Sequence, residues 1–281
     1  MRTALSLGIG YGQALVAAFQ FLTRLPIPFR FEYTETICRR SVIFYPLVGA
    51  VIGLLLSFAG AGLLHIVPVL PAACLLLVLW VGLTGGLHLD GLMDTADGIL
   101  SHRPREQMLE IMKDSRVGAM GVIVCVLQLL LKFALLYALL SSAKWPAASL
   151  LLAVVPIWSR WFMSVGIQGW PYARRESGMG SFYQSVGLKH VYAGLVLGMA
   201  LTAAWMWAGN QIIPDIPNEW PAIQGLAWQY IAAFPLLTFC CGYGIAAYLA
   251  HKLGGLTGDT YGALNELLET VLLLAVILLF H

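Results

Sequence analysis

The feature that most constrains this chain is a long run without formal charge. From Ser41 to Leu89 the sequence contains no Asp, Glu, Lys or Arg. A helix needs roughly 20 apolar residues to cross the hydrocarbon core of a bilayer, so this run has room for two spans. Pro68 and Pro71 interrupt it, because proline does not continue a helix from its interior. The sequence therefore predicts helices over about 42–66 and 71–89, joined by a tight turn.

Composition extends this prediction to the whole chain. Charged residues make up 11% of the sequence and hydrophobic residues 59%, whereas a soluble domain has about 25% charged residues. This excludes a soluble globular protein, a disordered chain and a nucleic-acid-binding protein. We expect an all-α, polytopic membrane bundle that forms one domain over residues 1–281, with about seven transmembrane helices. The five later spans are predicted at about 117–140, 147–167, 190–209, 227–249 and 261–280.

Residues 4–22 form an additional apolar segment at the N-terminus. It is long enough to span a membrane, but Gln13, Gln20 and three glycines reduce its hydrophobicity. The single Arg2 and the lack of a clear small-residue cleavage site argue against a removed signal peptide. We therefore expect a retained interfacial or re-entrant helix, with an eighth span as the alternative.

The positive charges of the loops predict the orientation. The N-terminal segment and the loops at 23–41, 90–116, 168–189 and 250–260 contain 13 of the 16 Lys and Arg residues. Cytoplasmic loops collect Lys and Arg, so these loops are predicted to face the cytoplasm. Most acidic residues fall on the same side, and we expect the chemistry of the protein there.

The densest polar motif is GGLHLDGLMDTADG, over residues 85–98. If a helix runs through it, Asp90, Asp94 and Asp97 lie at positions i, i+4 and i+7, on one face. Their carboxylates would repel one another, and no Lys or Arg lies within five residues of them. A divalent cation would relieve this repulsion, and oxygen ligands suit Mg²⁺ or Mn²⁺ better than Zn²⁺. The motif predicts a metal site, with a solvated acidic helix end as the alternative.

A second polar motif, LGGLTGDTYG, covers residues 253–262. Aligned on their Gly-Gly-Leu sequences, the two motifs place Asp259 opposite Asp90 and Glu266 opposite Asp97. Asp94 has no acidic counterpart, because Ala263 occupies the matching position, so an internal repeat is one interpretation of this match.

Glycines and basic residues supply candidates for phosphate binding. Glycine lets backbone amides approach an anion closely, which favours Gly255 and Gly258. Lys113 and Arg116 precede the helix predicted at 117–140, and helix N-termini attract anions. For Lys113, and for Arg174 in the next cytoplasmic loop, ordinary anchoring of a cytoplasmic loop is the alternative explanation.

Two polar residues near the predicted membrane edge or within a span need partners. Arg160 falls near the middle of the 147–167 helix, where an unpaired charge is costly, so it requires a buried acid or an anionic substrate. His88 is interpreted equally as a general base, a metal ligand or a buried core histidine. Acids for a metal, basic residues for phosphate and glycine-rich turns together indicate metal-assisted phosphoryl transfer at a membrane surface.

The same motifs resemble those of the bacterial cobalamin synthase family, the adenosylcobinamide-GDP ribazoletransferases. GLHLDGL at 86–92 is followed by MKDSRVG at 112–118. FLTRLPIP at 21–28 matches the N-terminal signature of the family, and LGGLTGDT at 253–260 matches its C-terminal one. The resemblance covers nearly the whole chain in the same order.

This resemblance implies the last assembly step of the cobalamin nucleotide loop, on the cytoplasmic face of the bacterial inner membrane. A ribose hydroxyl of α-ribazole, or of α-ribazole 5′-phosphate, would attack the cobinamide-linked phosphorus of adenosylcobinamide-GDP. GMP would leave, and adenosylcobalamin or its 5′-phosphate would form. The reaction would require Mg²⁺, with Mn²⁺ as a substitute.

On this hypothesis the motif residues receive roles. Asp94, Asp97 and His88 are the catalytic candidates. The expected metal ligands are Asp90, Asp94, Asp97, Asp259 and Glu266. The expected phosphate- and substrate-binding residues are Arg24, Lys113, Arg116, Arg160, Arg174, Gly255 and Gly258.

Two other functions compete with this hypothesis. A CDP-alcohol-type phosphotransferase of lipid synthesis also combines spans with aspartates, but its signature has Ala-Arg shortly after the first Asp-Gly, where this chain has Leu92-Met93-Asp94. A secondary transporter would place polar residues near the membrane midplane, which only Lys132 and Arg160 favour. Besides the two substrates and the lipid bilayer, other cobalamin-biosynthesis enzymes and a second copy of the chain are left open as partners.

Overall fold

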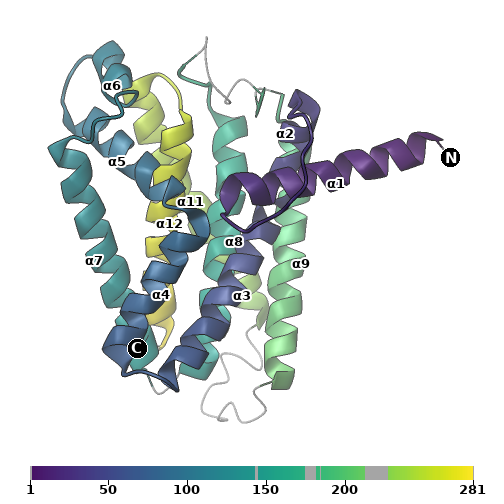
Figure 1. Ribbon diagram of the computed structural model, residues 1–281, viewed down its shortest axis with the longest axis vertical. Helices are drawn as coiled ribbons and strands as arrows, with labels where there is room; N and C mark the ends of the chain where they lie inside the picture. The colour runs from purple at the N-terminus through teal and green to yellow at the C-terminus, as the bar shows by residue number, and fades with distance from the viewer. Residues whose placement is uncertain (1, 143–144, 175–181, 184, 213–226, 281) are drawn as a thin grey trace.

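The structure of this protein, a computed structural model, describes residues 2–142, 145–174, 182–183, 185–212 and 227–280. Within these ranges the regular elements are helices, and the long ones run side by side as a bundle (Figure 1). Six described helices are long and apolar enough to cross a membrane, or seven if one sharply bent pair counts as one span. The predicted all-α membrane bundle is confirmed.

The helices follow the hydrophobic runs of the sequence. Most of the long ones begin and end within a few residues of the predicted spans. The long helices are α3 (Tyr45–Leu64), α4 (Val69–Thr84), α7 (Ala119–Ser141), α8 (Trp145–Gly169), α9 (Leu188–Ile212), α11 (Ala227–Leu253) and α12 (Gly258–Phe280). The remaining elements are α1 (Arg2–Leu22), α2 (Glu35–Ser41), the 3₁₀ turn η1 (Val42–Phe44), α5 (Leu87–Leu100) and α6 (Arg105–Ile111).

The second predicted span, 71–89, was wrong at its C-terminal end. Helix α4 ends at Thr84, and α5 leaves it at an angle of 87°. The cause is a pair of glycines, because Gly85 has φ 63° and Gly86 has φ 72°. Two successive left-handed residues end a right-handed helix, and glycine adopts this conformation without steric cost. The aspartates therefore lie on a separate helix that runs across the bundle, as Figure 1 shows.

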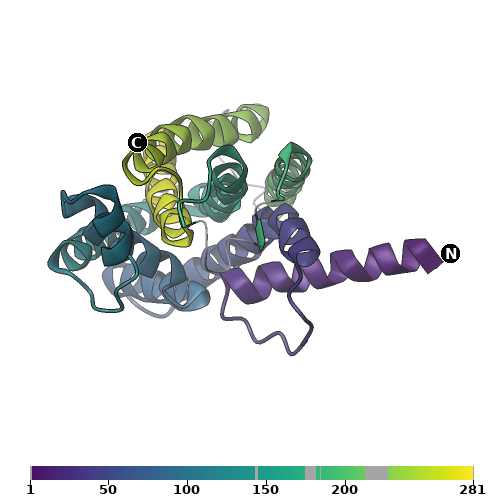
Figure 2. The same cartoon turned by 90° about the horizontal axis from the view of Figure 1, so that it is seen from above.

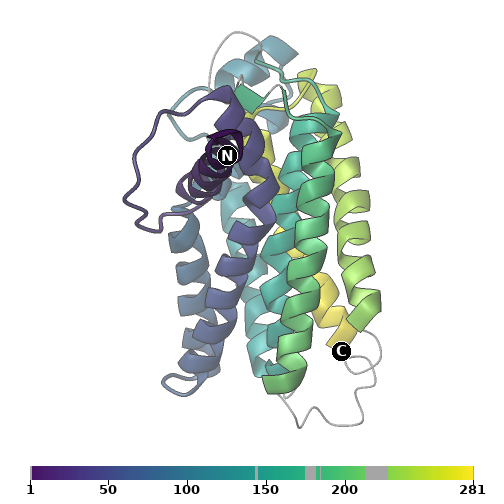
Figure 3. The same ribbon diagram turned by 90° about the vertical axis from the view of Figure 1, so that its right-hand side faces the viewer.

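Helix α1 lies across the bundle rather than along it. Figure 3 shows it nearly end-on against the upright helices, and Figure 2 shows its N-terminal end extending beyond the bundle. Only one side of its C-terminal half is buried, through Ala14, Ala17, Ala18 and Leu22. This orientation is the one expected for an interfacial helix and not for an eighth span.

Helix α8 is the centre of the bundle, and nearly all of its residues are buried. Helix α3 crosses it closely, because a methyl group on Gly49 or Gly53 would collide with backbone carbonyl groups of α8. One turn further, Ser57 Oγ donates a hydrogen bond of 2.7 Å to the carbonyl oxygen of Ser149. Small residues that allow backbone contact are a typical source of helix association in membranes.

Four charged side chains are buried where α7, α8 and α12 meet. Lys132 Nζ lies 2.8 Å from Oε2 of Glu266 and also contacts Oε2 of Glu269. Arg160 Nη1 lies 2.6 Å from Oε1 of Glu269. Lys132 Nζ also lies 4.3 Å from the ring centroid of Trp80. We call these four charged residues the buried ion cluster.

The buried ion cluster balances two positive against two negative charges. Burying an ion is costly, and only good pairing geometry offsets that cost. Asn265 Nδ2 and Gln128 Nε2 add hydrogen bonds to Glu269 Oε1 and to the carbonyl oxygen of Glu266, at 3.2 and 2.9 Å. The cluster therefore connects three helices only as long as each charge keeps its partner.

We predict that Glu269→Gln destabilises the bundle, because it leaves Lys132 and Arg160 short of a counter-charge. Removing one member of a buried pair costs roughly 3–5 kcal/mol. A clear drop in the melting temperature of the detergent-solubilised protein would be the readout. The control is Asp114→Asn, which breaks an exposed ion pair with Arg116 and is expected to leave the melting temperature unchanged. Equal melting temperatures for the two variants would contradict this stabilising role of the buried ion cluster.

Candidate active site

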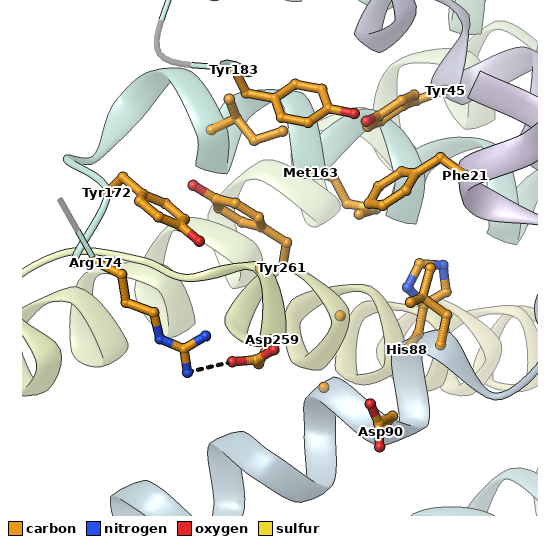
Figure 4. Close-up of a pocket in the computed structure, with 15 residues that line it drawn as sticks. Phe21, Tyr45, His88, Asp90, Met163, Tyr172, Arg174, Tyr183, Asp259 and Tyr261 are labelled. Carbon is orange, nitrogen blue, oxygen red and sulfur yellow. Dashed lines mark ion pairs between the residues drawn. The ribbon is translucent and has the colours of Figure 1, made fainter. Parts of the chain in front are cut away.

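A cavity of about 310 Å³ lies where the ends of several elements meet (Figure 4). The first turns of α5 and α12 form its floor, and the C-terminal ends of α1 and α8, with the start of α3, form its other sides. The cavity is lined by Phe21, Tyr45, Leu87, His88, Asp90, Gly91, Met163, Ile167, Tyr172, Arg174, Tyr183, Gly258, Asp259, Tyr261 and Gly262. Members of both aspartate motifs thus face one space.

Glycines bring the two motifs together. A methyl group on Gly91 of α5 would lie 2.6 Å from the carbonyl oxygen of Asp259, and one on Gly262 of α12 would lie 3.2 Å from the backbone of His88. A larger residue at Gly91 would collide with the α12 backbone, and one at Gly262 would press on the α5 backbone. The contact sets Asp90 and Asp259 on the same side of the cavity, although they are far apart in sequence.

The loop after α8 is fixed to the loop before α12 by backbone hydrogen bonds. Ala173 donates to the carbonyl oxygen of Leu256 at 2.8 Å, and Leu256 donates to that of Pro171 at 2.9 Å. This short bridge directs Arg174 toward α12, where its Nη2 lies 2.8 Å from Oδ2 of Asp259. The same nitrogen donates to the carbonyl oxygen of Met112 at 3.2 Å. The cavity therefore contains one basic side chain beside its carboxylates.

Three carboxylates interact near the polar part of the site: Asp90 and Asp259 line the cavity, and Asp94 lies one turn beyond Asp90 on α5, outside the lining. Asp94 is half-buried, and the charges of Asp259 and Asp90 both act on it, with Arg174 opposing them. Asp259 in turn interacts with the charge of Asp90. Among the described residues, no three His, Cys, Asp or Glu side chains converge closely enough to hold a metal ion as they stand. The donor chemistry suits a hard divalent cation, but the side chains would have to turn toward it.

Asp97, predicted to be a catalytic residue and a metal ligand, makes contacts that the sequence does not predict. Its Oδ2 accepts a hydrogen bond of 2.7 Å from the Gly118 amide, and its Oδ1 accepts one of 2.8 Å from the Gly121 amide. These amides belong to the N-terminus of α7, whose own cap residue, Gly118, has no side chain to satisfy them. Asp97 therefore caps α7 from α5 and fixes the two helices together.

Two further predicted site residues lie in the buried ion cluster. Glu266, expected to bind metal, is paired with Lys132, and its charged neighbours are Lys132, Glu269 and Arg160. Arg160, expected either to hold phosphate or to meet a buried acid, is paired with Glu269. Neither side chain faces the cavity, so the structure differs from the predicted metal and phosphate roles.

His88 lies at the border between the cavity and the bundle core. Its side chain is only 1% exposed, and its Nε2 has no hydrogen-bond partner among the described residues. A buried ring nitrogen without a partner is costly, which makes His88 a candidate contact for a bound ligand.

The remaining phosphate candidates are distributed over the surface near the site. Arg116 is 88% exposed and forms an ion pair of 2.6 Å with Asp114, whose pKa is lowered to about 2 by the hydrogen bonds from Arg116. Lys113 and Arg24 are also exposed, and the Arg24 side chain packs against Gly85. Lys113, Arg116 and Arg24 lie outside the cavity.

The two glycine candidates of the second motif differ from each other. The Gly255 amide donates to the carbonyl oxygen of Ala250 at 3.0 Å, and a methyl group there would collide with Pro171. Gly255 therefore ends α11 and is not free to bind phosphate. Gly258 lines the cavity, and a methyl group on it would meet open space.

The aromatic side of the cavity was not predicted from the sequence. Phe21, Tyr45, Tyr172, Tyr183 and Tyr261 all line it. Burial raises the pKa of Tyr172, and it raises that of Tyr183 to about 12, so both hydroxyl groups stay protonated at neutral pH. The available signal was proximity, since Tyr172 and Tyr261 each lie two residues from a predicted site residue.

Residues 14–277 match the protein family described as cobalamin-5-phosphate synthase. Three similar proteins are each named adenosylcobinamide-GDP ribazoletransferase. The one from Desulfitobacterium hafniense is 40% identical over 92% of this chain and 93% of its own length. The one from Brevibacillus brevis is 39% identical, over 94% and 97%, and the one from Acinetobacter baumannii is 37% identical, over 91% and 93%. No solved structure matches this chain.

We predict that Gly91→Ala lowers stability, because the added methyl group would press on the backbone of Asp259 and separate α5 from α12. The matched control is Gly82→Ala in α4, where a methyl group meets open space and alanine is the better helix former by about 1 kcal/mol. Melting temperatures in detergent should fall for the first variant and stay level or rise for the second. A Gly91→Ala protein as stable as Gly82→Ala would show that the helices tolerate a wider separation.

Proposed function

The chain belongs to the cobalamin-5-phosphate synthase family, and from this premise we propose that it is an adenosylcobinamide-GDP ribazoletransferase. The observation that carries the proposal is similarity over more than nine-tenths of the chain to proteins of that name. The cavity supports it, because carboxylates and an arginine around one space suit the transfer of a phosphoryl group. Lys132 and Arg160, the two features that favoured a transporter, are instead neutralised within the bundle.

In the proposed reaction, a ribose hydroxyl oxygen of α-ribazole or α-ribazole 5′-phosphate attacks the phosphorus linked to cobinamide. A new oxygen–phosphorus bond forms, and the bond from that phosphorus to the bridging oxygen breaks. GMP leaves with that oxygen, and adenosylcobalamin or its 5′-phosphate is the product. The proton of the attacking hydroxyl passes to a carboxylate, for which Asp90, which lines the cavity, and Asp94, one helical turn further along α5, are the candidates.

We assign Asp90, Asp94 and Asp259 as the residues that would hold Mg²⁺. Their donor oxygens are of the type Mg²⁺ prefers, and their mutual repulsion is opposed by Arg174 alone among the groups that act on Asp94. When bound, Mg²⁺ would offset the charge that develops on the diphosphate. Asp97 and Glu266 are left out of this set, because their oxygens already bind the α7 amides and Lys132.

Arg174 is proposed to bind the phosphate next to the attacked phosphorus. Its guanidinium lies beside Asp259 and is only partly exposed, and arginine suits bidentate contact with phosphate oxygens. The substrate phosphate would share Arg174 with Asp259. The exposed Arg24, Lys113 and Arg116 are proposed to contact the parts of the GDP group that lie outside the cavity.

We propose that the site faces the cytoplasm from the inner membrane. The cavity is built from the ends of helices that adjoin the loops rich in Lys and Arg, and cytoplasmic loops typically carry this excess. Both nucleotide substrates would then reach the site from the side on which nucleotides are made.

The first test gives the purified protein, in detergent or liposomes, adenosylcobinamide-GDP, α-ribazole 5′-phosphate and Mg²⁺. Chromatography should detect GMP and a cobalamin product in equal molar amounts. EDTA should abolish both, and added Mg²⁺ should restore them. Substrate that stays intact in the presence of folded protein would refute the proposed transferase activity. Turnover that persists in EDTA would refute the requirement for a metal ion.

We predict that Asp90→Asn lowers kcat by on the order of 100-fold or more, because it removes a charged oxygen from the reacting centre. Glu106→Gln serves as the control, since Glu106 is an exposed acid in the first turn of α6, and it should retain wild-type turnover. Melting temperatures would establish that both variants are folded. Full activity of Asp90→Asn would show that the Asp90 carboxylate is not needed for the reaction.

A further inference from the structure

The cavity has two chemically different halves. Figure 4 shows Arg174, Asp259 and Asp90 on one side, and Phe21, Tyr45, Met163 and Tyr183 grouped on the other. We call the second group the aromatic half. Tyr45 and Met163 are almost fully buried, and the rings of Phe21 and Tyr183 lie 6.3 Å apart at an angle of 36°.

We propose that the aromatic half binds the base of α-ribazole and turns its ribose toward Asp90 and Asp259. This inference rests on the proposed function, and it assigns to one substrate a subsite formed by α1, α3, α8 and Tyr183. The other substrate, adenosylcobinamide-GDP, would then approach the polar half from outside.

Size favours the smaller substrate. The cavity volume is about 310 Å³, at the lower end of the roughly 300–1,000 Å³ of small-molecule sites. A nucleoside with one fused ring system is of that scale, whereas a corrinoid that carries a nucleotide is several times larger. Of the two substrates, α-ribazole alone has a size that lets it enter the cavity whole.

Chemistry favours the base of α-ribazole over guanine. That base is a benzimidazole with two methyl groups, so one edge of its ring system is apolar. Phe21 and Met163 offer an apolar surface to such an edge, and aromatic rings add stacking. Guanine carries several donors and acceptors on its edge, which would lose their water partners against this surface at a cost.

His88 supplies the polar contact that the base needs. A benzimidazole attached to ribose keeps one free ring nitrogen, which accepts a hydrogen bond. His88 lines the cavity, and its buried Nε2 has no partner among the described residues. Donation from this nitrogen to the free ring nitrogen would satisfy both groups, and it would fix the base with its sugar directed to the carboxylates.

The test compares Phe21→Ala with Phe19→Ala. Both residues lie on α1 and pack against the bundle core, but of the two Phe21 alone also lines the cavity. We expect Phe21→Ala to raise the KM for α-ribazole about tenfold, the loss of one stacking contact, and to leave the KM for adenosylcobinamide-GDP within twofold. Phe19→Ala should change neither KM. If Phe21→Ala fails to fold, Tyr183→Leu takes its place, with the same expected result.

Equilibrium dialysis of α-ribazole against the detergent-solubilised protein separates this inference from the proposed function. Binding by the wild type that weakens about tenfold in Phe21→Ala supports the subsite, whether or not product forms. Product formation with an unchanged KM for α-ribazole in Phe21→Ala overturns the subsite and leaves the transferase intact. Two results would assign the aromatic half to the guanine nucleotide and overturn the α-ribazole subsite. One is a raised KM for adenosylcobinamide-GDP alone in Phe21→Ala, and the other is displacement of bound α-ribazole by GMP in the dialysis experiment.

Discussion

The backbone contact between α5 and α12 is the constraint on which the site depends. Gly91 and Gly262 allow it, and the turn at Gly85 and Gly86 directs α5 across the bundle so that it can form. Asp97 of α5 then caps the N-terminus of α7 and so joins the two helices. The carboxylates of the candidate site are thus carried by helices whose relative positions are set through glycines and backbone amides.

Much of the fold could be predicted from the sequence, because hydrophobicity and helix length are local properties. The bend after Thr84 was missed because the span was predicted from its hydrophobicity, which does not reveal the left-handed backbone at Gly85 and Gly86. The first aspartate motif was correctly assigned to a helix, because its spacing is a property of one segment. The sequence could not show which distant elements would face that helix.

The candidate site was predictable only in part for the same reason. Asp90 and Asp259, which the sequence placed in two separate motifs, both line the cavity, whereas Glu266, at the position that matches Asp97, faces the bundle core. The helical spacing from Asp259 to Glu266 does not reveal that Lys132 of α7 packs against Glu266 and pairs with it. The aromatic side chains were missed because tyrosine and phenylalanine are common in membrane helices and carry no motif of their own.

The buried ion cluster has a consequence for biogenesis. Lys132 and Glu266 are separated by 134 positions in the chain, and helices enter a membrane in the order of their synthesis. Lys132 and Arg160 therefore arrive in the bilayer well before α12, the last helix, brings both carboxylates. Until then the two cations must stay near the interface or in contact with water. The final helix thus completes the bundle electrostatically as well as sterically, because without it Lys132 and Arg160 would lack the carboxylates that neutralise them.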